Sequence, residues 1–187
     1  MNFLRINRFL FLNLASILIF CTSSSAQDDW IVYKADAILS FEVQVPAEMG
    51  IKTKKINTDL GVMTTTTYAH ESPKDAANFL YVVNIVEYPP GTFPVDSTEL
   101  AIDFLSEALQ SIVEGLEGDL VYQSELNEEG NGQGILFRLK YDDGYGVIKG
   151  KTYIKDDVFI TLQVYTTKDK SLNDEMNLFL DSFKTMF

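Results

Sequence analysis

Four cationic side chains in the second half of the sequence have the spacing to form one charged surface. Arg138 and Lys140 precede the Asp143-Gly144 dipeptide, and Lys149 and Lys151 follow it. Asp-Gly is a preferred hairpin turn because both central turn positions need positive φ. Such a turn pairs residue 140 with 147 and 138 with 149. Because side chains at i and i+2 of a strand share a face, this register predicts one cationic face.

The predicted cationic face allows two interpretations. Like charges placed opposite each other destabilise a sheet unless something neutralises them. In the first and favoured interpretation, the lysines protect an exposed edge hairpin from aggregation and are balanced by nearby Asp or Glu. In the second, Arg138, Lys140, Lys149 and Lys151 form a docking surface for an anionic partner.

No arrangement of residues for catalysis or metal binding can be recognised. His70 is the only histidine, no Gly-x-Ser-x-Gly elbow accompanies it, and a surface loop after a strand is its expected place. Zinc needs three or four His, Cys or carboxylate ligands. The acidic stretches 128–131 and 142–144 lack the spacing of a known calcium loop, although calcium binding there is left open. We expect no catalytic residue, metal or cofactor, and a carboxylate-based hydrolase is the least favoured alternative.

Residues 1–26 have the three parts of a secretory signal. Arg5 and Arg8 precede an apolar run at residues 9–20, and small residues occupy the positions before a cut at Gln27. The apolar run is shorter than the roughly 20 residues that cross a bilayer, and no later stretch is long enough. We therefore expect cleavage and export.

Cys21 provides an alternative to simple cleavage. The residues around it resemble a bacterial lipoprotein box, in which the cysteine would carry a lipid anchor. That box normally has a small residue before the cysteine, whereas this chain has Phe20. The sequence therefore favours a free mature chain, residues 27–187, as one domain in the periplasm or outside the cell.

The predicted mature chain is strongly acidic and contains no cysteine. It keeps 13 cationic and 27 acidic residues, which gives a formal charge of −14. Nucleic acids and anionic membranes need a cationic footprint on their protein partners. The charge therefore argues against both, and the missing cysteine excludes disulfides and thiol chemistry.

Hydrophobic periodicity predicts a sheet-rich domain with two helices. The near-continuous apolar run at 79–88 indicates a central strand that is covered on both faces. Strands are predicted at 30–34, 40–45, 51–57, 60–69, 79–88, 120–126, 134–142, 145–155 and 158–166.

The two predicted helices are amphipathic. Asp96 can cap the first, which Gly118 is placed to end, and Ser171 is the expected cap of the second. The buried stripes consist of Ile102, Leu105, Leu109, Ile112 and Leu116 in the first helix, and of Leu172, Met176, Phe179, Leu180 and Phe183 in the second.

The loop at Asp156-Asp157 decides which face the last strand buries. A two-residue loop puts Val158 and its i+2 neighbours on the lysine face, whereas a three-residue loop puts them opposite. A three-residue loop is favoured, because it keeps the apolar residues of the neighbouring strands on the same face of the sheet. The opposite face then carries Phe137, Leu139, Tyr141, Gly146, Ile148 and Gly150, with the glycines giving a helix room to approach.

The chain resembles the PsbP-like superfamily. The resemblance rests on the strand Phe41-Glu42-Val43-Gln44-Val45-Pro46, on the order strands, helix, hairpins, helix, and on the ending Phe179-Leu180-Asp181-Ser182-Phe183-Lys184. This superfamily includes the extrinsic protein of the photosystem II oxygen-evolving complex, DcrB-like bacterial envelope proteins and a Ran-binding nuclear-import factor. The resemblance implies an α+β fold in which helices flank an antiparallel sheet, and it implies no reaction.

These observations favour a non-catalytic module that binds another protein, as an assembly accessory or an inhibitor. The alternative is a small-ligand-binding protein with a pocket between the sheet and a helix. Aromatic residues would line that pocket, such as Tyr81, Phe104, Phe137 and Tyr165, although the same residues could simply fill the core.

Overall fold

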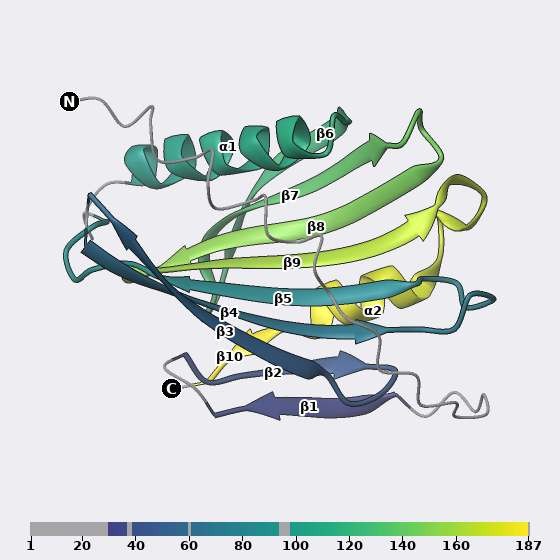
Figure 1. Ribbon diagram of the computed structural model, residues 1–187, viewed down its shortest axis with the longest axis horizontal. Coiled ribbons are helices and arrows are strands. Elements are labelled where there is room, and N and C mark those ends of the chain that lie inside the picture. Colours follow the sequence, from purple (N-terminus) through teal and green to yellow (C-terminus); the bar gives the residue numbers. More distant parts are fainter. Residues whose placement is uncertain (1–29, 37–38, 60, 94–97, 187) are drawn as a thin grey trace.

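A central antiparallel sheet organises the computed structural model, which describes residues 30–36, 39–59, 61–93 and 98–186 (Figure 1). Helix α1 covers one face of this sheet. Helix α2 and a smaller sheet lie on the other face. The predicted α+β architecture is therefore confirmed. The predicted signal peptide, its cleavage site and Cys21 lie outside the described residues.

The main sheet has seven strands in the order β3-β4-β5-β9-β8-β7-β6, and the small sheet has the order β1-β2-β10. Every predicted strand is present, with ends within two residues of the predicted ones, and the short β10 is an addition. The elements are β1 (Ile31–Ala35), β2 (Phe41–Val45), β3 (Gly50–Thr58), β4 (Gly61–Glu71), β5 (Leu80–Glu87), α1 (Thr98–Gly115), β6 (Asp119–Glu128), β7 (Gly132–Tyr141), β8 (Gly146–Lys155), β9 (Val158–Thr167), α2 (Asp174–Ser182) and β10 (Lys184–Thr185).

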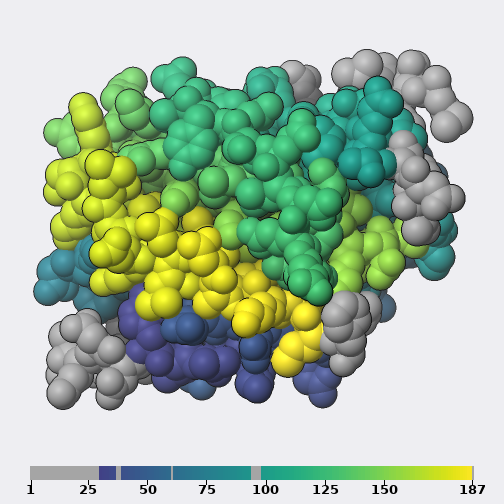
Figure 2. Space-filling model, turned by 180° about the vertical axis from the view of Figure 1, so that it is seen from behind, coloured from purple at the N-terminus to yellow at the C-terminus, as the bar shows by residue number. Residues whose placement is uncertain are grey.

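The main sheet separates two hydrophobic cores, because successive side chains of a strand point to opposite faces. On β5, Val82 packs in the core beneath α1, and its neighbours Tyr81 and Val83 pack in the core on the α2 side. All three are fully buried, which confirms the prediction that this strand is covered on both faces. Figure 2 shows the yellow C-terminal segment between the purple N-terminal strands and the green elements.

The β7-β8 hairpin has the predicted register. Lys140 pairs with Val147 and Arg138 with Lys149. Asp143 and Gly144 have φ of 51° and 84°, the positive values that the turn requires. The sequence therefore placed the four cations correctly on one face.

The glycines of this hairpin make room for aromatic rings rather than for a helix. A Cβ on Gly150 would lie 2.4 Å from Cζ of Phe137, and one on Gly146 would meet the ring of Tyr141. Both rings belong to β7, the neighbouring strand. Helix α1 does pack over this face of β7 and β8, but the space directly at the two glycines is taken by the rings of Phe137 and Tyr141.

The β8-β9 turn contains two residues, so the predicted three-residue loop is wrong. Lys155 pairs with Val158, which puts Val158 and Leu162 on the lysine face. The prediction failed because it assumed that only one face of the sheet is buried. Here α2 and the small sheet cover the lysine face and give Leu162 an apolar environment there.

The end of α1 differs from the prediction in one position. Glu117, with φ of 49°, has the left-handed conformation that closes the helix. The amide of Gly118 then donates to the carbonyl of Val113 at 2.9 Å. Gly118 is required for space, because a Cβ there would lie 2.6 Å from the carbonyl oxygen of Lys140. The predicted cap Asp96 lies outside the described residues.

Helix α2 is capped by Asn173 and not by Ser171. The Asn173 side chain accepts a hydrogen bond from the Met176 amide at 3.0 Å. The Ser171 hydroxyl instead accepts a hydrogen bond from Arg138 at 2.7 Å. This shift of the helix start turns Leu172, predicted to be buried, outward, with 87% of its surface exposed.

Candidate functional site

The four predicted cations lie together on the face of β7 and β8 that also carries α2. Arg138 and Lys149 are direct cross-strand partners, and Lys140 and Lys151 lie two residues further along their strands. Of these four residues, Lys151 is buried and the other three are partly exposed.

Lys151 belongs to the interior. Its ammonium lies 2.8 Å from a carboxylate oxygen of Glu128 and 2.9 Å from one of Asp181, and its side chain is only 7% exposed. Burial alone would lower the pKa of Lys151, but the hydrogen bonds to both carboxylates outweigh it and raise the pKa above its ordinary value. Lys151 therefore links β8 by two ion pairs to the end of β6 and to α2.

Glu128 is the centre of this buried network. Its carboxylate also accepts hydrogen bonds from the Tyr153 hydroxyl at 2.6 Å and from the Asn131 side chain at 3.3 Å. The side-chain oxygen of Asn131 in turn accepts a hydrogen bond from the Thr185 amide, which fixes β10. Burial would raise the pKa of Glu128, but the hydrogen bonds from Lys151 and Tyr153 lower it overall. Sequence analysis assigned no such role to Glu128.

Arg138, Lys140 and Lys149 differ from Lys151 in their surroundings. Within the described ranges, no carboxylate oxygen lies within 4.0 Å of any of them. Arg138 donates to the neutral Ser171 hydroxyl, and Lys149 donates to the neutral side-chain oxygen of Asn177. Burial chiefly lowers the pKa of Lys149, and the charges of Lys151 and Arg138 lower it further against the opposing effect of Asp181. Arg138 and Lys149 therefore repel each other, and none of the three cations has a carboxylate within ion-pair distance in this part of the chain.

An exposed aromatic residue extends this group to the edge of the main sheet. Tyr122 of β6 is the direct cross-strand partner of Arg138, and 39% of its surface is exposed. β6 is the last strand of the main sheet, and residues 119–125 are all exposed. We call Tyr122, Arg138, Lys140 and Lys149 the cationic face.

Comparison with solved structures identifies the fold. Cyanobacterial PsbP (CyanoP) from Synechocystis sp. PCC 6803 matches over 90% of this chain and 99% of its own, with a TM-score of 0.57 and 13% identity. The chain has a PsbP-like fold. Protein of unknown function PA94 from Pseudomonas aeruginosa matches over 78% of this chain and 88% of its own, at 13% identity and a TM-score of 0.38. No protein-family model and no curated protein sequence matches the chain.

The other chemistry-bearing residues are spread over the PsbP-like fold. His70 lies within β4, half-buried, and not in the predicted surface loop. Its ring nitrogen is 3.3 Å from the carbonyl oxygen of Glu48, and burial lowers its pKa. In the described residues, no three His, Cys, Asp or Glu side chains group as metal ligands would. The same part of the chain contains no helix long and apolar enough to cross a membrane.

The aromatic residues predicted to line one ligand pocket are not brought together by the PsbP-like fold. Tyr81 lies in the core on the α2 side, whereas Phe137 lies in the core beneath α1. Phe104 packs among Tyr88, Phe93 and Phe159. Of the four, only Tyr165 lines the pocket that the structure forms between α1 and the sheet.

Proposed function

We propose that this chain is an exported, non-catalytic accessory module that binds an acidic protein partner through the cationic face. One observation carries the proposal. Arg138, Lys140 and Lys149 lie together with no carboxylate within 4.0 Å among the described residues, although the chain has 27 acidic residues and a net charge of −12. An anionic partner would relieve their mutual repulsion, and it would find the complementary charge at this place.

The edge strand β6 beside the cationic face favours a partner that binds as an extended segment. β6 ends the main sheet, so one side of its backbone has no strand neighbour among the described residues. Extended peptides bind such edges by adding a strand, and side chains on alternate positions then give specificity. Acidic side chains on such a segment would lie on the same face as Arg138, two strands away beyond Tyr122, and Lys149 one strand further would attract them over a longer distance. The predicted export signal supports a partner in the periplasm or outside the cell.

The design of a charge test follows from the position of Lys151. Charge reversal of Lys149 and Lys151 together is unsuitable, because Lys151 is a buried part of the fold. Arg138→Gln and Lys149→Gln remove two charges at residues whose own contacts are neutral hydrogen bonds. A matched control is Lys34→Gln, an exposed lysine on β1 of the small sheet.

The double variant R138Q/K149Q should bind a peptide of alternating Glu and Thr at least about tenfold more weakly than the wild type. The wild-type affinity should also fall with added salt, since exposed charges are screened beyond about 10 Å at 0.1 M. Fluorescence anisotropy of a labelled peptide measures both effects. Equal affinities of the double variant and K34Q would contradict the proposal.

A further inference from the structure

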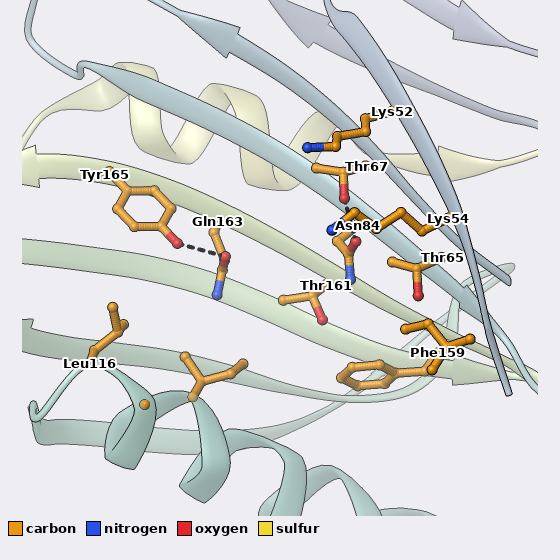
Figure 3. Close-up of a pocket in the computed structure, with 13 residues that line it drawn as sticks. Lys52, Lys54, Thr65, Thr67, Asn84, Leu116, Phe159, Thr161, Gln163 and Tyr165 are labelled. Atoms are coloured by element: carbon orange, nitrogen blue, oxygen red, sulfur yellow. Dashed lines mark hydrogen bonds between the residues drawn. The ribbon is translucent and has the colours of Figure 1, made fainter. Parts of the chain in front are cut away.

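A pocket of about 110 Å³ lies between the C-terminal half of α1 and strands β3, β4, β5 and β9 (Figure 3). It is on the face of the main sheet opposite the cationic face, so it is independent of the proposed function. Ile112 and Leu116 of α1 and Phe159 of β9 give it an apolar wall. Its floor, by contrast, is polar.

The polar floor follows a single row across the sheet. Thr67 of β4 pairs with Asn84 of β5, and Asn84 pairs with Thr161 of β9. Lys52 of the edge strand β3 pairs with Thr67 and begins the row, and its side chain is exposed. Gln163 lies one step along β9 on the same face. Polar side chains therefore occupy positions where the rest of this face buries apolar ones.

The side-chain oxygen of each amide in the floor already accepts one hydrogen bond. The Thr67 hydroxyl donates to the side-chain oxygen of Asn84 at 2.8 Å, and the Tyr165 hydroxyl donates to that of Gln163 at 3.0 Å (Figure 3). Among the described residues neither amide nitrogen has a hydrogen-bond partner, so the nitrogens are the groups of Asn84 and Gln163 left for a ligand. Both nitrogens are donors.

Two hydroxyl groups of the pocket have no hydrogen-bond partner among the described residues. They belong to Thr65 and Thr161, and their oxygens are buried. Thr161 as a whole is only 3% exposed. Buried polar atoms are normally hydrogen-bonded, and each exception calls for an explanation. A ligand that accepts hydrogen bonds would satisfy both.

The charged residues of the lining have one sign. Lys52 and Lys54 line the pocket, and no Asp or Glu among the described residues does, in a chain with nearly twice as many acidic as basic residues. The amide nitrogens and the hydroxyls form a set of donors, and the two lysines add positive charge beside it. The complement of such a set is an anion with several lone pairs, and a carboxylate offers about four acceptor sites on two oxygens.

We propose that this pocket binds a short aliphatic carboxylate. The carboxylate would accept hydrogen bonds from Thr161, Asn84 and Gln163, and its chain would lie against Ile112 and Phe159. The volume sets the size, since a cavity of about 150 Å³ holds benzene. A carboxylate of roughly two to four carbons fits, with butyrate at the upper end, and a drug-sized ligand needs a pocket of at least about 300 Å³. The apolar wall favours a carboxylate over inorganic phosphate.

Side-chain amide signals of the full chain provide the test. In ¹H–¹⁵N NMR titrations with butyrate, the NH₂ groups of Asn84 and Gln163 should shift and reach saturation. Butyramide has the same shape without the charge, and it should bind at least about tenfold more weakly. Inorganic phosphate, which has no apolar chain, should also bind more weakly than butyrate.

Two threonine variants supply matched controls. Thr152 is the cross-strand partner of Thr161 and also has a buried hydroxyl with no hydrogen-bond partner among the described residues, but it does not line the pocket. Thr161→Val should weaken butyrate binding at least about tenfold, whereas Thr152→Val should leave it unchanged. Both variants should fold, because each removes a hydroxyl that has no partner within the described protein. Equal binding of butyrate and butyramide, tighter binding of phosphate, or unchanged affinity in T161V would overturn the proposal.

Discussion

Replacing Lys151 by methionine is expected to lower the free energy of unfolding by about 3 kcal/mol. Methionine fills much of the space of the lysine chain but leaves Glu128 without its ammonium partner at 2.8 Å. Removing one partner of a buried ion pair typically costs about 3–5 kcal/mol, and the cost here falls at the low end because 33% of the Glu128 side chain stays exposed. In a domain of this size, a loss of 3 kcal/mol corresponds to a fall in Tm of roughly 6–12 °C.

Two further variants separate charge from volume at this site. Lys140→Met changes a cation on the same face that has no carboxylate within 4.0 Å among the described residues, and it should cost no more than about 0.5 kcal/mol. Adding Glu128→Gln to Lys151→Met should recover much of the loss, because the stranded charge is gone. Chemical denaturation measures all of these values. A Lys151→Met variant as stable as Lys140→Met would show that the ion pairs of Lys151 are unimportant.

The same site predicts a dependence on pH. The pKa of Glu128 is lowered from 4.5 in the folded protein, so its ionised form is favoured by folding. Its stabilising contribution is therefore fully present above pH 4.5 and is lost as the pH falls through the lowered pKa. The difference in stability between wild type and Lys151→Met should shrink over that range. A constant difference through acid pH would contradict the account of the network.

Gly150→Ala is expected to destabilise the protein by about 3 kcal/mol, although it adds one methyl group. The new Cβ would lie 2.4 Å from Cζ of Phe137 and 2.5 Å from the carbonyl oxygen of Leu162. Phe137 is fully buried and the carbonyl belongs to the backbone of β9, so neither can move without disturbing the sheet. Overpacking of this kind forces side chains off their rotamers and shifts the backbone.

Gly50→Ala is the matched control for this substitution. Gly50 also lies in the main sheet, but its added Cβ would be 3.7 Å from the nearest atom, an ordinary contact. It should change stability by less than about 1 kcal/mol and in the favourable direction, because alanine restricts the unfolded chain. Thermal denaturation distinguishes the two. If both variants melt together, the close approach of Phe137 to Gly150 is not a constraint.

The sequence predicted what depends on local chemistry. The register of the β7-β8 hairpin followed from Asp143-Gly144, because few residues other than Gly, Asn and Asp accept positive φ. The alternation from Phe41 to Val45 likewise predicted β2, with the correct end and a start one residue too early. These features need no knowledge of which segments meet in the folded chain.

The role of Lys151 could not be predicted in this way. Its partners Glu128 and Asp181 lie on other elements, far away along the chain, and only the folded sheet brings them to one lysine. The β8-β9 loop was misjudged for a related reason, because the apolar cover from α2 on the lysine face is a tertiary feature. The pocket floor required the strand order, since β9 must lie beside β5 for Thr161 to meet Asn84.

The most direct test of the cationic face is site-specific photo-crosslinking in the cells that make this protein. A benzophenone amino acid in place of Tyr122 should capture an acidic protein, and R138Q/K149Q should abolish that capture. The same crosslinker at Val62, which is exposed on β4 towards the other edge of the main sheet, should not capture it. Equal capture from both positions, or capture that survives the loss of both charges, would contradict the assignment of this face to an acidic partner.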